Sequence, residues 1–459
     1  MNYSEVKKKL DGVGCGFCLA KWTQVTMHLG LGMTHSCHHP SPHKIPLAEI
    51  KRNPTALHNT SFKKRKRKEM LEGGKPEECN YCWNVEKSSS SFSDRVFKSA
   101  EPWSLDQFEE IKDLNWRADY NPRYVEVSFS NTCNFKCAYC GPQFSSKWVE
   151  EIEKYGPYET SIKYNDIDYI KSKGEMPYKQ HEDNPYVEAF WKWWPDLYKD
   201  LHTFRITGGD PLLSRDTFRV LEYIQVNWED NPNLSLAINT NLGVPDALVD
   251  RFIALAKDLC ENNKVRELIL YTSVEATGPQ AEYTRFGLNY DKFWDNVEKV
   301  LSQLPKVTIN IMATYNALSV FTYDDLIEKV FEMKKKYQNN ERYSIAAIQL
   351  DTSFLRWPAH LSVKVLEKKH MDLILKSTKK MLYYGMTYHD HSDYGFSSVE
   401  IQKLKRIYDY ATDESDDFDV DKNRKDLVKF VDQYDKRRGT DFLKTFPELK
   451  QLYAENREG

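Results

Sequence analysis

Three cysteines lie within eight residues of one another, at Cys133, Cys137 and Cys140, in the spacing CxxxCxxC. Thiolates this close together repel each other unless a cation or an iron–sulfur cluster gathers them. Three protein ligands also leave one coordination position open, and in metal sites an open position serves chemistry rather than structure. The spacing therefore predicts a metal or cluster centre that binds a further ligand.

The element that must position this loop is a strand that ends just before it. Residues 123–130 alternate apolar and polar side chains, which is typical of a strand with one buried face. The strand delivers the cysteines at its carboxyl end, where barrel-type α/β enzymes place catalytic groups. Strands and helices then alternate over residues 118–357, with an insertion at about 157–202. Six parallel strands are fewer than the eight that close a barrel, so we expect an α/β fold built on a partial (β/α)6 TIM-type barrel.

The insertion contains an aromatic stretch at residues 190–194. Its apolar residues recur near helical spacing, which indicates a buried helix face more than a substrate platform. Pro195 follows directly and predicts a break in that helix, because proline cannot donate to the helical hydrogen-bond ladder.

The cysteine loop resembles the CxxxCxΦC motif of the radical SAM superfamily, in which three cysteines hold a [4Fe–4S] cluster and S-adenosylmethionine (SAM) chelates the fourth iron. Tyr139 occupies the aromatic position, which the family places against the adenine. The resemblance implies reductive cleavage of SAM to a 5′-deoxyadenosyl radical that abstracts a substrate hydrogen. It also implies an external one-electron reductant such as flavodoxin or ferredoxin.

Later strand ends supply the other contacts to SAM that this resemblance implies. The motif Gly-Gly-Asp-Pro resembles the family's GGEP, which holds the SAM amino group; a Ser-x-Glu turn followed by an arginine resembles the segment that meets the SAM carboxylate and the ribose or substrate. A surface turn with an exposed arginine would explain the second group nearly as well. The expected cofactor-binding residues are Gly208, Gly209, Asp210, Pro211, Thr240, Asn241, Ser273, Glu275 and Arg285.

A second group of cysteines lies in residues 1–100, which hold five of the nine cysteines but show little apolar periodicity. A small region with so little core usually needs a metal or cluster to fold. The CxxC pairs Cys15/Cys18 and Cys79/Cys82 would make a structural zinc site. We therefore expect a small cysteine-rich domain over residues 1–100.

An alternative ligand set follows from a resemblance to the Twitch, or half-SPASM, module of radical SAM enzymes. Its members are Cys18, Cys37 after Gly32, Cys79 and Cys82, with Cys15 as the alternative to Cys37. In the family this module holds an auxiliary [4Fe–4S] cluster and follows the barrel, whereas here it precedes it. We favour this set, and because four cysteines leave no open iron, we expect electron transfer from it.

The net charge of −3 gives no global attraction to nucleic acid or membrane. Residues 1–100 nevertheless carry 17 Lys and Arg against 9 Asp and Glu, largely through the run Lys63–Lys68. Such a run is usually a solvated helix face, and the sharper reading is a phosphate-contacting patch for RNA. No stretch approaches 18 apolar residues and no signal region follows Met1, so we expect a cytoplasmic protein with reduced cysteines and no membrane partner.

Three hypotheses for the function follow. The leading one is a radical SAM enzyme of oxidoreductase type that acts on a peptide, protein or small molecule. The second is a radical SAM enzyme that modifies RNA, and the third is a non-catalytic zinc-binding interaction module. Residues 358–459 are expected to form a helical C-terminal extension without readable chemistry.

Overall fold

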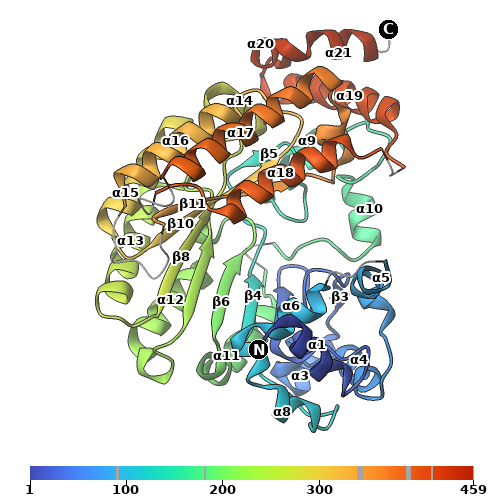
Figure 1. Ribbon diagram of the computed structural model, residues 1–459, viewed down its shortest axis with the longest axis vertical. Helices are drawn as coiled ribbons and strands as arrows, with labels where there is room; N and C mark the ends of the chain where they lie inside the picture. Colours follow the sequence, from blue (N-terminus) through green and yellow to red (C-terminus); the bar gives the residue numbers. More distant parts are fainter. Residues whose placement is uncertain (89–91, 180–181, 339–345, 389–393, 415–416, 458–459) are drawn as a thin grey trace.

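The computed structural model describes residues 1–88, 92–179, 182–338, 346–388, 394–414 and 417–457, and in this part of the chain the central sheet has nine strands (Figure 1). Their order is β11-β10-β8-β7-β6-β4-β1-β2-β3. The strands are β1 (Gln24–His28), β2 (Met33–His35), β3 (His43–Lys44), β4 (Tyr124–Ser128), β6 (Thr203–Thr207), β7 (Ser235–Asn239), β8 (Glu267–Thr272), β10 (Thr308–Tyr315) and β11 (Ile348–Phe354).

Strands β4, β6, β7, β8, β10 and β11 run parallel, each paired with its neighbour along the chain. In β4, Val125 and Val127 are fully buried toward the helices, while the alternating Glu126 is half-buried. Helices α12, α13, α15 and α16 lie along the outer side of the curved sheet (Figure 1). The partial TIM-type barrel expected from the sequence is confirmed. The helices between its strands are α9 (Ser146–Tyr155), α10 (Ile167–Ser172), α11 (Pro185–Asp200), α12 (Arg215–Asn227), α13 (Asp246–Glu261), α14 (Gly278–Thr284), α15 (Tyr290–Gln303) and α16 (Tyr323–Lys336).

The N-terminal region joins this sheet, which the sequence did not lead us to expect. Strand β1 runs parallel to β4 with His28 opposite Ser128, and β2 and β3 follow as antiparallel strands. Residues of β1 such as Val25 belong to the main core, whereas Phe17 and Trp83 belong to a second, smaller core. The region therefore extends the barrel beyond its first strand and also packs a core of its own. Its longer helices are α1 (Tyr3–Asp11), α4 (Ser61–Leu71), α5 (Asn80–Ser88) and α6 (Asp94–Ala100).

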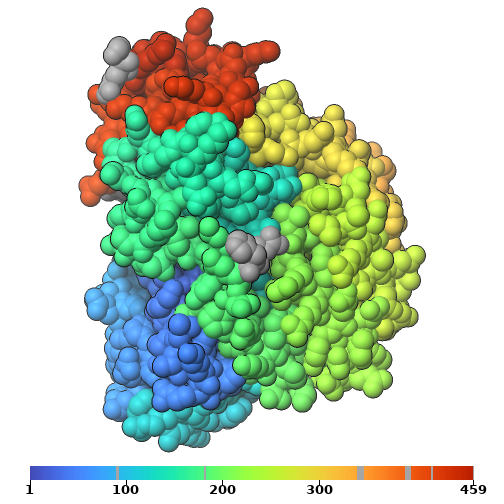
Figure 2. Space-filling model, turned by 180° about the vertical axis from the view of Figure 1, so that it is seen from behind, coloured from blue at the N-terminus to red at the C-terminus, as the bar shows by residue number. Residues whose placement is uncertain are grey.

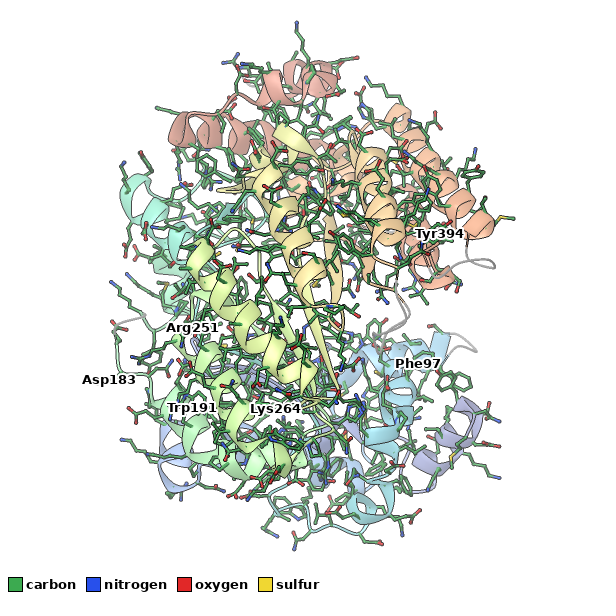
Figure 3. All side chains as sticks on the ribbon, turned by 90° about the vertical axis from the view of Figure 1, so that its left-hand side faces the viewer. Phe97, Asp183, Trp191, Arg251, Lys264 and Tyr394 are labelled. Atoms are coloured by element: carbon green, nitrogen blue, oxygen red, sulfur yellow. The ribbon has the colours of Figure 1, made fainter. Side chains whose placement is uncertain are left out.

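Helix α11 contains the aromatic stretch of the insertion. Trp194 is fully buried, and Trp191, labelled in Figure 3, is partly buried and donates to Asp216 Oδ1 at 2.8 Å. The break expected at Pro195 is wrong, since α11 continues through it to Asp200. Pro195 lies on the exposed side, and burial of side chains before and after it, such as Leu197, holds both halves in one helix.

The C-terminal extension is helical, as expected, and it reaches the barrel's insertion. Figure 2 shows the insertion, coloured teal to green, between the blue N-terminal region and the red C-terminal helices. Tyr178 N donates to Gly30 O at 2.8 Å, and Ser161 N donates to Asp426 Oδ1 at 2.9 Å. Nowhere among the described residues does a helix combine the length and apolarity needed to cross a membrane. The main helices of the extension are α17 (Met371–Tyr388), α18 (Ser398–Thr412), α19 (Val420–Arg438), α20 (Phe442–Thr445) and α21 (Lys450–Asn456).

Candidate functional site

The three-cysteine loop, residues 133–140, follows β4 at the carboxyl edge of the barrel and is bound to a distant segment by backbone pairing. Its short strand β5 (Lys136–Cys137) pairs antiparallel with β9 (Arg285–Phe286), so that Cys137 lies opposite Arg285. Ala138 N also donates to Thr284 O at 2.7 Å. The loop is therefore held by long-range hydrogen bonds as well as by the strand before it.

The paired glycines after β6 allow close packing against the start of this loop. Gly208 has φ +130°, and a Cβ there would lie 2.7 Å from Ser130 O. A Cβ on Gly209 would lie 2.3 Å from Thr132 O. Asp210 N donates to the same Thr132 oxygen at 2.7 Å. The two glycines therefore let the end of β6 pack closely against the residues that begin the cysteine loop.

The Asp210 carboxylate is turned into the protein. It is 2% exposed and accepts hydrogen bonds from Leu212 N at 2.9 Å, Thr240 Oγ1 at 3.1 Å and Asn241 N at 2.7 Å. Burial raises its pKa to about 6, against the effect of these donors. Asp210 therefore joins the ends of β6 and β7, while Pro211 begins the short helix after it.

Glu275 and Arg285 form a buried ion pair beside the loop. Arg285 Nη2 lies 2.7 Å from Glu275 Oε2, and the two side chains are 7% and 1% exposed. Tyr139 OH donates to Glu275 Oε1 at 3.2 Å, and Arg285 Nη1 donates to Cys137 Sγ at 3.7 Å. Burial raises the pKa of the Cys137 thiol, and the Arg285 cation opposes that rise. The pair therefore orients Tyr139 and favours the thiolate of Cys137, while Ser273 lies half-buried directly after β8.

The sulfur of Cys133 accepts hydrogen bonds from two amide groups. Phe135 N donates to Cys133 Sγ at 3.4 Å, and Asn241 Nδ2 donates to the same sulfur at 3.9 Å and to Asn134 Oδ1 at 2.9 Å. Burial raises the pKa of Cys133 to about 12. Such donors to sulfur stabilise a thiolate and tune the potential of a bound cluster.

Within the part of the chain that the structure describes, three ligand atoms come within 4.8 Å of one another only at His38, His39 and Asp94. The three sulfurs of the cysteine loop therefore do not all lie within that distance of one another.

The N-terminal cysteines meet in one small pocket. It is lined by Cys18, Cys37, Cys79 and Cys82. Burial, together with the other three thiols, raises the pKa of Cys18 to about 12. Cys15 is exposed, with its sulfur 3.6 Å from Gly73 O, and does not line this pocket. The structure therefore brings together the set that includes Cys37.

Two buried lysines act electrostatically on the thiols of this four-cysteine pocket. Lys21 is 2% exposed, pairs with Glu78, and opposes the rise that burial causes in the pKa of Cys79. Lys63 is 1% exposed, its Nζ lies 3.0 Å from His58 Nδ1, and Cys37 is among the groups that raise its pKa against burial. Burial lowers the pKa of Lys63 well below its ordinary value. A buried cation is costly unless an anion offsets it, and four thiolates around a cluster carry that negative charge.

The basic run on α4 does not form one continuous exposed patch. Lys63 and Arg67 are buried. The other members mostly pair with carboxylates: Lys64 with Asp119, Lys66 with Glu69 and Lys68 with Glu72. The structure thus adds no support to the expectation that the run Lys63–Lys68 contacts RNA.

The comparison with known families decides the identity of the barrel. Residues 127–317 match the radical SAM superfamily. They form a radical SAM domain. The match begins within β4 and ends after β10, so the four-cysteine pocket and the C-terminal helices lie outside this domain.

Proteins similar to part of this chain carry the name GTP 3′,8-cyclase. One from Nautilia profundicola is 24% identical over 119 residues, which is 26% of this chain and 27% of that protein. One from Aliarcobacter butzleri is 28% identical over 119 residues, with the same shares, and one from Sulfurovum sp. is 26% identical over 118 residues, 26% of each chain. The alignments span about a quarter of each of these proteins, so the likeness concerns a segment rather than a whole enzyme.

Sequence reasoning missed two polar residues at the radical SAM loop. Asn134 bridges the loop to Asn241 and donates to Gly243 O at 2.7 Å. Glu151 is 4% exposed on α9, with Lys136 Nζ 2.5 Å from its Oε2. A carboxylate on the apolar face of an otherwise amphipathic helix was the available signal for Glu151.

Proposed function

We propose that this protein reductively cleaves SAM and uses the resulting 5′-deoxyadenosyl radical to abstract a hydrogen atom from its substrate. The three-cysteine loop of the radical SAM domain carries this proposal, because three cysteine ligands leave one iron of a [4Fe–4S] cluster to SAM. The bound cluster supplies the electron that splits a sulfur–carbon bond of SAM into methionine and the radical. An external one-electron reductant provides that electron.

The residues around the loop have separate roles in this proposal. Cys133, Cys137 and Cys140 hold the cluster, and the donors from Asn241 and Arg285 favour the thiolate forms. Tyr139 is the aromatic contact for the adenine, held by Glu275. Because the Asp210 side chain is engaged inside the protein, the SAM amine is met by backbone carbonyls of the Gly-Gly stretch, with Ser273 left to face the carboxylate end.

The four-cysteine pocket is proposed to hold a second [4Fe–4S] cluster that transfers electrons. Its four thiols provide a complete ligand set, so the cluster has no open iron for a substrate. The buried Lys21 and Lys63 offset its negative charge. An acceptor of this kind favours oxidation of the substrate radical.

The inner face of the barrel favours a polar small molecule over a peptide as substrate. Glu126 and Arg205 lie opposite each other on β4 and β6, 3.8 Å apart and 26% and 18% exposed. The Arg205 guanidinium lies 4.1 Å from the Tyr271 ring and donates to Asn239 Oδ1 at 3.0 Å. A charged, partly open surface suits a substrate with polar groups. GTP is the first compound to test, because the similar proteins carry the name GTP 3′,8-cyclase.

Anaerobic reconstitution followed by iron, sulfide and zinc analysis tests this proposal. We expect about eight irons per chain, for two clusters, and release of 5′-deoxyadenosine from SAM under reduction. Assays with GTP and with a peptide library then separate the two substrate classes. A colourless protein that contains zinc and no iron would show that the enzyme assignment is wrong.

A further inference from the structure

The C-terminal extension reaches the three-cysteine loop through Arg438, the last residue of α19. This side chain lies about 300 residues beyond the loop in sequence and outside the radical SAM match, yet it is fully buried. The composition of the extension does not indicate a role at the cluster site, but the contacts of the Arg438 side chain do.

Arg438 makes hydrogen bonds to both the loop and the helix after it. Nη1 donates to Lys136 O at 2.6 Å, while Nε and Nη2 donate to Glu151 Oε2 and Oε1, each at 3.0 Å. The second contact is a bidentate guanidinium–carboxylate pair, which fixes the orientation of the planar group. The carbonyl of the residue before Cys137 is thereby tied to α19.

Aromatic rings complete the enclosure of the guanidinium. Its carbon lies 3.9 Å from the centre of the Tyr434 ring and 4.9 Å from that of Trp148. Trp148 Nε1 also donates to Cys137 O at 3.0 Å. Two successive carbonyls of the loop are therefore held by donors from α19 and α9, and rotation of either peptide would break a buried hydrogen bond.

We propose that Arg438 is a positioning residue of the cluster site: it fixes the backbone at Lys136 and Cys137, and its charge favours the reduced form of the cluster. The inference rests on the proposed function for the second effect and on contacts of the protein alone for the first. The two positive charges of Arg438 and Lys136 outnumber the single negative charge of Glu151, so a net positive charge remains near Cys137. Positive charge near a cluster raises its reduction potential.

Arg437 provides a matched control on the same helix. It also bridges to the barrel's insertion, with Nη1 donating to Gly156 O at 2.9 Å and Nη2 to Pro157 O at 3.1 Å, but the contacts found for it do not include the cysteine loop. Arg437→Gln and Arg438→Gln thus remove the same group from neighbouring positions. Arg438→Lys keeps the charge and removes the bidentate geometry.

Two measurements on the full-length chain test the two effects. Hydrogen exchange of the apo protein should become faster at residues 136–140 in Arg438→Gln, partly so in Arg438→Lys, and stay unchanged in Arg437→Gln. In the reconstituted protein, EPR-monitored reduction should require a more negative potential in Arg438→Gln, with a potential near wild type in Arg438→Lys. Misplacement of the loop should slow SAM cleavage by on the order of tenfold or more.

The outcomes separate this inference from the proposed function. Equal exchange in wild type and both Arg438 variants would overturn the positioning role, whatever the metal content. A wild-type protein that takes up no iron would overturn the proposed function while the exchange data still decide the role of Arg438. If Arg438→Gln does not fold, hydrogen exchange in Arg438→Lys still tests the positioning role, because this variant removes the bidentate geometry and keeps the charge.

Discussion

The two cysteine sites of this protein are built differently. The three-cysteine loop lies at an open barrel edge and is held by backbone contacts from segments far apart in sequence, among them β9 and the glycines after β6. The four-cysteine pocket is enclosed by its own small core, and buried cations such as Lys21 lie beside it. This difference fits the proposed function, in which the first site would present an open coordination position in a fixed orientation and the second would hold a closed, negatively charged centre.

Removal of the three-cysteine ligands should have the largest effect. We expect the triple variant Cys133→Ala, Cys137→Ala, Cys140→Ala to lose SAM cleavage completely and to keep about four of about eight irons, because the other site has its own ligands. Iron analysis and detection of 5′-deoxyadenosine measure both quantities. Residual SAM cleavage in this variant would show that the three-cysteine loop is not the site that SAM cleavage requires, and the two sites would no longer differ in this respect.

A single pair of substitutions tests the ligands of the four-cysteine pocket. Cys37→Ser should lose about four irons, since a three-cysteine remnant at a closed site binds its cluster poorly. Cys15→Ser should retain all of them, because Cys15 is exposed and lies outside the pocket. The reverse result would assign the site to the two CxxC pairs.

The pocket should load iron less well as the pH falls. Burial raises the pKa of Cys18 to about 12 and that of Cys82 to about 11, so these two thiols are protonated at neutral pH in the empty pocket and each must lose a proton to bind. Each such proton lowers the apparent affinity by up to about tenfold per pH unit of acidification. Iron retention against a chelator between pH 6 and 9 measures this slope, and a flat profile would contradict it.

A smaller effect is expected at the junction that supports the three-cysteine loop. Asp210→Asn places an amide against donors from Leu212, Thr240 and Asn241, and it should reduce the free energy of unfolding by about 1–3 kcal/mol. Denaturant unfolding measures this change. Asp246→Asn, at an exposed carboxylate at the start of α13, is the control and should be close to wild type.

The smallest effect is expected on the surface of α4. The combined variant Lys64→Gln, Arg65→Gln, Lys68→Gln removes three charges of α4, and the ion pairs of Lys64 and Lys68 are worth at most about 1 kcal/mol each. SAM cleavage and iron content should be unchanged. An RNA-binding assay on the same variant gives a direct test of the RNA hypothesis, which would gain support only if wild type binds RNA and the variant does not.

Much of the barrel could be predicted from the sequence because its signals are local. The alternation at residues 123–130 places a strand before Cys133, and the positions of Gly208, Thr240 and Ser273 after later strands follow from the same periodicity. Strand ends of a parallel sheet meet at one edge, so these residues had to lie near one another. Burial of the aromatic stretch in α11 was predictable on the same grounds, but its continuity through Pro195 was not.

Only the tertiary structure decided which groups each side chain meets. The sequence by itself determined the cysteine spacing, and with it the kind of centre that the loop can hold. It could not show that β1 pairs with β4, that Asp210 turns toward β7, that Cys37 rather than Cys15 enters the pocket, or that Arg438 caps the loop. Each of these depends on packing between segments distant in the chain, and such contacts are set by the shape and charge of the whole fold rather than by local periodicity.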